Sequence, residues 1–319
     1  MPDEAPATVP GRPVTPVSVA TLDAILDRHG LRGRRVVPLS GTSAGSSVYL
    51  LGDDRVLRVP HQQPGSVQGL ETACIAIPAA RAAGVRTPRI LVLDERRDLV
   101  PVPYAILERV PGEPYSRHGW AIAAAAAIWR ELGHDLALLH AGVGRSGPAG
   151  GLPANDTFDD PRPWLDGLVT DGLIGPQDAA WLRRVIDDLA PLACTPEPRT
   201  FCHGDVNADN ILIDPPARQY LALIDWDGAG WMDPAWDFVP VPLRAVPFML
   251  EGYRQVGRVP GDETAEARIL WHHVQYRLFI LTHTSPLNPD RVSTMLQRLR
   301  AGMRDLLQLP GARWMRYLL

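Results

Sequence analysis

The segment Phe201–Trp226 holds the residues of this chain best suited to chemistry. It opens with an apolar run into the tripeptide HGD, which ends at Asp205, and Asn210 follows five residues later. The runs ILID and LALID predict two paired strands, and their pairing would bring Asp205, Asn210 and Asp225 to one end of a hairpin. Carboxylate and carboxamide oxygens are hard donors, so this set favours a magnesium ion that also binds phosphate oxygens.

A carboxylate beside such a metal ion can also orient an attacking hydroxyl group and accept its proton. Either half of the segment alone is equally typical of an ordinary hairpin with surface aspartate and asparagine. Both halves together, at this spacing and on neighbouring strands, favour a site for phosphoryl transfer.

The motif HGDxxxxN followed by IDWD is similar to the catalytic and metal-binding motifs of the aminoglycoside phosphotransferase family. That family includes macrolide and hygromycin phosphotransferases and choline-kinase-like small-molecule kinases. The resemblance covers about residues 31–310 and implies a protein-kinase-like fold with ATP or GTP as co-substrate. It implies that Asp205 is the catalytic base and that Asn210 and Asp225 bind Mg²⁺.

The same resemblance extends to the residues around this motif. His203 is similar to the structural histidine of the family's catalytic loop. Asp233-Pro234 and Asp237 resemble the downstream DPxxD motif, which orders the segment after the metal aspartate and caps a helix. Met232 is a departure, because the family usually has glycine there.

The Gly/Ser stretch Ser40–Ser47 lies between two predicted strands and favours a loop that holds phosphates. Glycine permits close backbone approach, and serine hydroxyls add hydrogen-bond donors. A plain hairpin turn has the same composition, and the chain has no Walker motif and no lysine. The predicted phosphate contacts are Ser40, Gly41, Thr42, Gly45 and Ser46.

Arg58 stands on the next predicted strand, where protein kinases place the lysine that binds the α- and β-phosphates. All 32 basic residues are arginine, and a guanidinium can bind two phosphate oxygens at once. Glu71, early on the following helix, is predicted to orient Arg58, with a solvated helix carboxylate as the alternative. The segment Tyr104–Pro114 resembles the kinase hinge, and its backbone near Glu108 and Val110 is predicted to meet the purine.

Hydrophobic periodicity predicts a sheet in the first third of the chain and helices in the remainder. The predicted strands are Arg34–Ser40, Ser47–Leu51, Arg55–Pro60, Arg89–Asp94 and Pro103–Val110. The predicted helices include Thr21–Gly30, Gly69–Ala83, Ala265–Thr284 and Pro289–Leu307. Pro78 is expected to kink or split the second of these.

This pattern and the resemblance together predict an α+β, bilobal protein-kinase-like fold. Residues 1–17 are expected to form a disordered, proline-rich arm. Residues 18–110 are the predicted N-lobe with an antiparallel sheet, and residues 111–319 are the predicted larger, mainly helical C-lobe. A length of 319 residues is sufficient for two such lobes.

Composition argues against several other classes of protein. The formal charge of −4 argues against nucleic-acid binding, and the nine-residue apolar run Ala121–Trp129 is too short to span a membrane. The acidic, proline-rich start is unlike a signal peptide, and the three cysteines show no close spacing. A cytoplasmic protein is therefore expected.

The nature of the acceptor is indicated by length and charge. Some sixty residues separate His140 from His203, whereas protein kinases run almost directly between these points. In the family that the chain resembles, such an insertion binds a small-molecule acceptor, and the DFG and APE segments of protein kinases are absent here.

Charge in this region has both signs. Residues 151–200 hold nine acidic residues against four arginines, and Asp156, Asp159 and Asp160 are candidate contacts for a cationic aminoglycoside. Residues 267–319 instead hold eight arginines against two aspartates, which favours a neutral or weakly charged acceptor.

The sequence thus predicts an ATP- or GTP-dependent O-phosphotransferase that modifies a hydroxyl of a small molecule. The favoured acceptor is an antibiotic of the nucleoside, macrolide or aminoglycoside type, with resistance as the result. A housekeeping kinase for a choline-, fructosamine- or homoserine-like metabolite and a nucleotide-binding pseudokinase stay open as alternatives. No nucleic-acid or membrane partner is expected.

Overall fold

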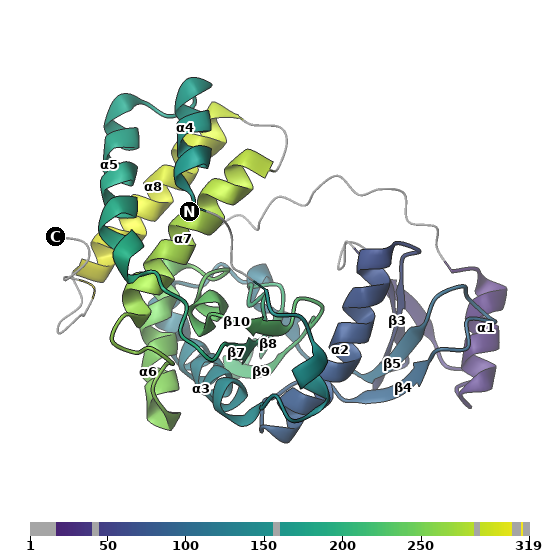
Figure 1. Cartoon of the computed structure of the whole chain (residues 1–319). Helices are drawn as coiled ribbons and strands as arrows, with labels where there is room; N and C mark the ends of the chain where they lie inside the picture. Colours follow the sequence, from purple (N-terminus) through teal and green to yellow (C-terminus); the bar gives the residue numbers. More distant parts are fainter. Residues whose placement is uncertain (1–16, 40–44, 156–159, 284–287, 308–313, 315–319) are drawn as a thin grey trace. The chain divides into compact units, whose positions relative to one another are not determined.

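The computed structural model describes residues 17–39, 45–155, 160–283, 288–307 and 314 (Figure 1). These residues form two compact units, each built from several chain segments. The first unit contains the described residues up to Gly119 together with Gly142–Leu152 and Asp209–Ala229. The second contains Trp120–Ala141, Pro153–Ala208 and the described residues from Gly230 onward. The predicted arm lies outside the described residues except for Val17, and the predicted lobe boundaries stay a prediction.

A five-stranded antiparallel sheet of order β1-β2-β3-β5-β4 lies at the centre of the first unit (Figure 1). Its strands are β1 Val36–Leu39, β2 Ser46–Leu51, β3 Arg55–Pro60, β4 Ile90–Asp94 and β5 Tyr104–Glu108. Leu57 and Val59 of β3 share a hydrophobic core with Ile25 of helix α1, Val19–Arg28. Because side chains alternate along a strand, Arg58 points to the opposite face of the sheet.

Helix α2 runs without interruption from Pro64 to Ala82. It begins five residues before the predicted start, and the predicted split at Pro78 is wrong. Proline removes one backbone hydrogen bond, but the buried face of α2 with Leu70, Ala73 and Ile77 stabilises the helix on both sides of it.

A three-stranded sheet of order β6-β8-β9 completes the first unit. Its strands are β6 Glu113–Pro114, β8 Ile211–Asp214 and β9 Gln219–Leu223. The 3₁₀ helix η1, Tyr115–Arg117, directly follows β6. Ile211 pairs with Leu223, and the Ile224 amide donates to the carbonyl of Asn210 at 2.9 Å. Asn210 and Asp225, two of the three residues predicted for this place, therefore lie at the open end of the hairpin, and the turn after Asp214 closes the other end. The third, Asp205, belongs to the second unit.

The second unit is mainly helical, with a short antiparallel pair of strands, β7 Thr200–Cys202 and β10 Gly230–Met232. Its helices are α3 Ala126–Gly142, α4 Arg162–Thr170, α5 Pro176–Leu189, α6 Val246–Val256, α7 Ala265–His283 and α8 Pro289–Leu307. Short 3₁₀ helices include η2 Ile122–Ala125, η4 Ala190–Leu192, η5 Pro234–Phe238 and η6 Leu243–Ala245 here, and η3 Pro148–Gly151 in the first unit.

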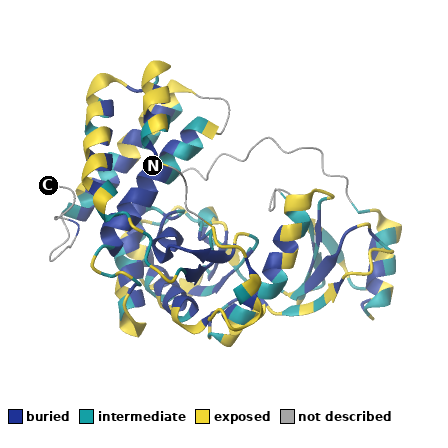
Figure 2. Cartoon of the chain, in the orientation of Figure 1, coloured by how far each residue is buried: buried dark blue, intermediate teal, exposed yellow. Residues whose placement is uncertain are grey.

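Burial differs between these helices. Figure 2 shows exposed faces along α4 and α5, whereas α7 is buried over most of its length. Helix α3 has a buried apolar face, on which Trp129, Leu132, Leu136 and Leu139 recur at helical spacing. No helix in the described part of the chain combines the length and apolar character needed to cross a membrane.

Helices α3 and α6 meet at two glycines. A Cβ at Gly133 would lie 1.9 Å from the carbonyl oxygen of Met249, and a Cβ at Gly252 would lie 1.9 Å from that of Arg130. The two backbones are therefore in direct contact, and neither position has room for a side chain. This contact fixes α3, which carries His140 towards the catalytic loop described below.

We expect Gly133→Ala to lower the free energy of unfolding by about 1–3 kcal/mol or more, because its methyl group forces the two helices apart. Gly167→Ala is the matched control. Gly167 lies on exposed α4 with no described atom within 4 Å of an added Cβ, and alanine there should stabilise the helix by about 0.5–1 kcal/mol. Urea unfolding measures both values, and wild-type stability in Gly133→Ala would contradict the assigned contact.

Candidate active site

The loop after β7 carries the predicted base, Asp205. Gly204 has a φ of 85°, in the left-handed region that favours glycine, so the HGD tripeptide turns sharply here. The Asp205 amide donates to Nδ1 of the fully buried His203 at 3.2 Å. The Asn207 side-chain amide donates to Oδ2 of the half-buried Asp205 at 2.9 Å. His203 thus shapes the loop from inside, and Asn207 orients the carboxylate.

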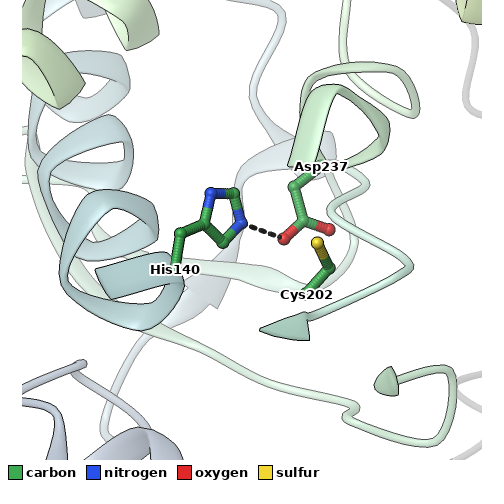
Figure 3. A group of neighbouring side chains, drawn as sticks. All are labelled: His140, Cys202 and Asp237. Carbon is green, nitrogen blue, oxygen red and sulfur yellow. Dashed lines mark hydrogen bonds and ion pairs between the residues drawn. The ribbon is translucent and has the colours of Figure 1, made fainter. Parts of the chain in front are cut away.

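The carboxylate of Asp237 anchors this loop, and Figure 3 shows it beside the imidazole of His140 and the thiol of Cys202. It accepts the backbone N–H groups of His203 at 2.9 Å and Gly204 at 2.8 Å. His140 of α3 places Nε2 3.0 Å from Asp237 Oδ2, and its Nδ1 lies 3.1 Å from the hydroxyl of Tyr253. Burial raises the pKa of Tyr253, so its O–H donates to Nδ1, and the Nε2–H of His140 donates to Asp237.

His140, Cys202 and Asp237 also satisfy the distance criterion for a metal site, since one potential ligand atom of each lies within 4.8 Å of the others. Their hydrogen bonds favour a different role. Both ring nitrogens of His140 and both oxygens of Asp237 have partners. Burial raises the pKa of the Cys202 thiol, which donates to the Thr200 carbonyl at 3.5 Å. A neutral thiol is a poor metal ligand, so we interpret this group as a scaffold for the loop.

The DPxxD motif continues the scaffold. Asp233 accepts the amide of Ala235 at 2.8 Å and so caps η5, as predicted, and its Oδ1 also pairs with the fully buried Arg268. Trp236, within the motif, donates its indole N–H to the Gly204 carbonyl at 2.8 Å. Asp237 and Trp236 of this motif therefore bind the catalytic loop, whereas Asp233 joins the start of η5 to α7.

Tyr276 of α7 lies beside the same loop. Its ring centroid is 5.8 Å from that of Trp236, in an edge-to-face arrangement. Burial and the negative charge of Asp205 raise the pKa of the Tyr276 hydroxyl. An aromatic residue therefore accompanies the predicted base, in a position that sequence reasoning did not identify.

In the first unit, Asp225, one of the two predicted metal ligands, lies next to Arg58. Asn210 is buried at 6% exposure, and Asp225 has a φ of 66°, which is unusual for a residue other than glycine. The Asp225 Oδ1 atom lies 3.3 Å from Nη1 of Arg58. Trp226, between Asp225 and Asp227, is fully buried and donates to the Thr87 hydroxyl at 2.8 Å. This indole fixes the segment that presents both aspartates.

Arg58 is paired differently from the prediction. Its Nη1 donates to Asp227 Oδ1 at 2.7 Å, its Nη2 donates to Asp227 Oδ2, and its Nε donates to Ser46 Oγ at 3.1 Å. Burial opposes the positive charge, but Asp225 and Asp227 outweigh it and raise the pKa of Arg58. Glu71 instead lies exposed on α2, with its carboxylate 3.8 Å from Arg97.

The predicted orientation of Arg58 by Glu71 is therefore wrong. The direction of the helix side chains explains this. Gly69 of α2 faces Asp227, and Glu71, two residues further along, points to a different side of the helix. The carboxylate that pairs with Arg58 comes instead from the segment after the metal aspartate.

The remaining predicted nucleotide contacts are only partly described. Ser40, Gly41 and Thr42 lie outside the described residues. Gly45 accepts the His61 amide at 2.8 Å, directly before β2. Glu108 ends β5, with its amide donating to the Arg89 carbonyl at 2.9 Å, and the Val110 carbonyl accepts from Gly112 at 2.9 Å. Their contacts with phosphates and purine stay predictions.

The sequence model of the phosphotransferase enzyme family matches residues 36–270 of this chain. The chain belongs to this family. The enzyme class predicted above, a phosphotransferase with an alcohol group as acceptor, is thereby confirmed. No curated protein matches this chain by sequence.

Solved structures resemble this phosphotransferase in fold. The GDP and kanamycin complex of the aminoglycoside phosphotransferase APH(2")-IIia has a TM-score of 0.64 at 18% identity, covering 90% of this chain and 99% of that one. A macrolide 2'-phosphotransferase from Brachybacterium faecium has a TM-score of 0.56 at 21% identity, covering 88% and 98%. The ADP and hygromycin B complex of APH(4)-Ia has a TM-score of 0.58 at 19% identity, covering 89% and 98%. The predicted kinase-like α+β fold is confirmed.

Two residues near the predicted site, Asp227 and Tyr276, were assigned no role of their own from the sequence. Asp227 is recognisable in the sequence as the second aspartate of the IDWD motif. No sequence spacing, however, indicates that it pairs with an arginine on a distant strand. Nothing in the sequence singles out Tyr276, since one aromatic residue on a buried helix is usually part of the core.

Loss of the Asp237 carboxylate is expected to change how stability depends on pH. Burial alone opposes its ionisation, but the hydrogen bonds from His140 and from the Gly204 backbone outweigh this and hold the pKa of Asp237 below its usual value. A lowered carboxyl pKa stabilises the folded state above the unfolded value of about 3.9, and this stabilisation disappears as the pH falls through the folded value.

Asp237→Asn should therefore unfold more easily than the wild type at pH 7, and the difference should shrink on acidification below about pH 4. Thermal unfolding across this range measures it. Asp188→Asn, at an exposed position of α5, is the matched control and should follow the wild-type curve. A difference that stays constant with pH would contradict the assigned role.

Proposed function

We propose that this phosphotransferase transfers the terminal phosphoryl group of ATP or GTP to a hydroxyl group of a small molecule. The observation that carries the proposal is the register of β8 and β9. It brings Asn210 and Asp225 to one end of a hairpin, with Arg58 3.3 Å from Asp225. Metal-binding oxygens beside a buried cation form an arrangement suited to a bound triphosphate.

The donor set fits magnesium. Asn210 and Asp225 offer a carboxamide and a carboxylate oxygen, the ligands that this hard ion prefers, and most of its remaining ligands would be phosphate oxygens and water. The two residues would hold the ion, which when bound would neutralise phosphate charge. Arg58 would bind phosphate oxygens through its guanidinium, and the loop Ser40–Ser47 would supply backbone donors.

Asp205 would act on the acceptor. The side-chain amide of Asn207 donates to one of its oxygens at 2.9 Å and orients the carboxylate, which would accept the proton of the attacking hydroxyl. The sharp turn at Gly204 and the buried Asp237 fix this carboxylate in advance. Positioning and charge neutralisation would provide most of the rate enhancement, as in other phosphoryl transfer enzymes.

The acceptor is proposed to be neutral or weakly charged, with a ring that can pack against aromatic side chains. Tyr276 lies beside Asp205, and further along α7 the ring of Phe279 stacks on His283 at 4.2 Å and meets Trp164 at 5.7 Å. Such a series of rings suits the flat face of a sugar or a base.

The acidic residues of the second unit support the same choice. Of the three predicted acidic contacts, Asp156 and Asp159 lie outside the described residues, and Asp160 pairs with Arg162 at 2.8 Å. Asp187 also pairs with Arg162, and Asp178 pairs with Arg300 of α8 at 2.6 Å. Arginines therefore neutralise much of the negative charge that a polycationic acceptor would need.

We further propose that the acceptor is an antibiotic and that its phosphorylation gives resistance in the cytoplasm, where the nucleotide is available. The structural neighbours named above for kanamycin, macrolide and hygromycin B support this class at the level of fold. The test is mass spectrometry of nucleoside, macrolide and aminoglycoside antibiotics, with choline, fructosamine and homoserine as alternatives, after incubation with enzyme, magnesium and ATP or GTP. Addition of one phosphate to a metabolite alone would favour the housekeeping kinase.

Asp205→Ala should lower turnover by roughly 10²–10⁴-fold, because the acceptor hydroxyl loses its base and its orientation. Nucleotide affinity should stay at the wild-type value. Asp209→Asn, an exposed aspartate of the same loop, is the control. Steady-state kinetics and a nucleotide titration measure the two effects, and full activity in Asp205→Ala would remove its assigned role.

Asp225→Ala should lose the magnesium dependence of nucleotide binding, because one of two protein ligands to the ion is gone. Calorimetric titration of ATP with and without magnesium measures this. Asp214→Ala, at the opposite end of the same hairpin, should bind nucleotide as the wild type does. An unchanged magnesium effect in Asp225→Ala would show that the ion is held elsewhere.

A further inference from the structure

The geometry points to Asp227 as the residue that positions Arg58 for the nucleotide phosphates, an inference that rests on the proposed function. In protein kinases a helix glutamate performs this task for the strand lysine. Here the carboxylate would come from the segment that also carries the metal aspartate, two residues after Asp225. Asp227 would act through Arg58 and is a positioning residue.

The pair has the geometry of a strong, oriented contact. Both terminal nitrogens of Arg58 donate to the two oxygens of Asp227, one of them at 2.7 Å. The Arg58 side chain is only 11% exposed, and that of Asp227 is 31% exposed. A bidentate guanidinium–carboxylate pair with this burial holds the plane of the guanidinium, which a single contact would leave free to rotate.

The arrangement leaves donors for a ligand. A guanidinium has five N–H groups. Asp227 takes two of them and the Ser46 hydroxyl takes one, at 3.1 Å. Two N–H groups, one on each terminal nitrogen, are not bound by Asp227 or Ser46 and would donate to phosphate oxygens. The Asp225 Oδ1 atom lies 3.3 Å from Nη1, so Asp225 adds a second negative charge beside the guanidinium.

Helix α2 is shaped to accept this carboxylate. A Cβ at Gly69 would lie 2.6 Å from Asp227 Oδ2 and 2.9 Å from its Cγ. Glycine therefore allows the helix to pack directly on Asp227. Any larger residue would push the carboxylate off Arg58.

The test is calorimetric titration of ATP and GTP into the full chain, with magnesium and with EDTA. Asp227→Asn should weaken nucleotide binding roughly tenfold, the loss expected for a charge-assisted contact. The loss should persist in EDTA, because Asp227 acts through Arg58 and does not bind the metal ion. Gly69→Ala should weaken binding in the same direction while keeping the carboxylate. Asp53→Asn, an exposed aspartate of the β2–β3 turn, is the matched control.

Three further variants separate this role from a structural one. Arg58→Gln should lose affinity, and Arg58→Gln/Asp227→Asn should lose no more than Arg58→Gln alone, because the two residues act as one unit. Glu71→Gln should bind nucleotide as the wild type does. Gly69→Ala keeps the test decisive if Asp227→Asn does not fold.

Wild-type nucleotide affinity in both Asp227→Asn and Gly69→Ala would overturn the assignment, and so would a loss of affinity that occurs only in the presence of magnesium. Additive losses of affinity in Arg58→Gln/Asp227→Asn would also overturn it. The same holds for a loss in Glu71→Gln equal to that in Asp227→Asn. Tighter binding in Asp227→Asn would also overturn it, since Asp227 would then compete with phosphate for Arg58. A wild-type chain that binds neither ATP nor GTP would instead refute the proposed function itself.

Discussion

A single buried carboxylate, that of Asp237, is the interaction on which the catalytic loop depends. Removing a negative charge from water is costly unless several donors surround it. Asp237 has three: the amides of His203 and Gly204 and the imidazole of His140. These donors belong to the HGD loop and to α3, so compensation of one charge fixes the position of Asp205 relative to the helical core of its unit.

The first unit contains a buried positive charge, that of Arg58, which also needs compensation. A buried cation on β3 requires negative partners, and a chain without lysine must place a planar, five-donor group there. A guanidinium is satisfied best by a carboxylate that it meets side-on. Asp227 provides this geometry, and the glycine on α2 provides the space. Arginine stands here in place of the kinase lysine, and its partner acid comes from a loop in place of a helix. Both differences follow from the side-on pairing that a guanidinium needs and from the space that the glycine on α2 leaves for it.

Local sequence patterns predicted the elements well because periodicity and turn residues act over short distances. The strand Arg55–Pro60 and the helix Pro289–Leu307 have the predicted bounds. The hairpin end with Asn210 and Asp225 followed from the pairing of two adjacent runs. The partner of Arg58 did not, because it lies 169 residues away and depends on how closely a helix approaches a loop. Periodicity also could not show that the burial of α2 would outweigh Pro78.

The hairpin of β8 and β9 has the predicted metal ligands at one end and its exposed turn at the other. Asn210 and Asp225 lie at the open end, whereas Pro216, Ala217 and Arg218 are exposed in the turn that joins the strands. Four strand residues on β8 stand between the two ends. A longer turn adds little closure entropy, and the buried strand residues Ile211, Ile213 and Leu223 specify the register. The tip is therefore a place where a dye-labelling tag or peptide epitope can be inserted to follow the protein without disturbing the residues at the far end.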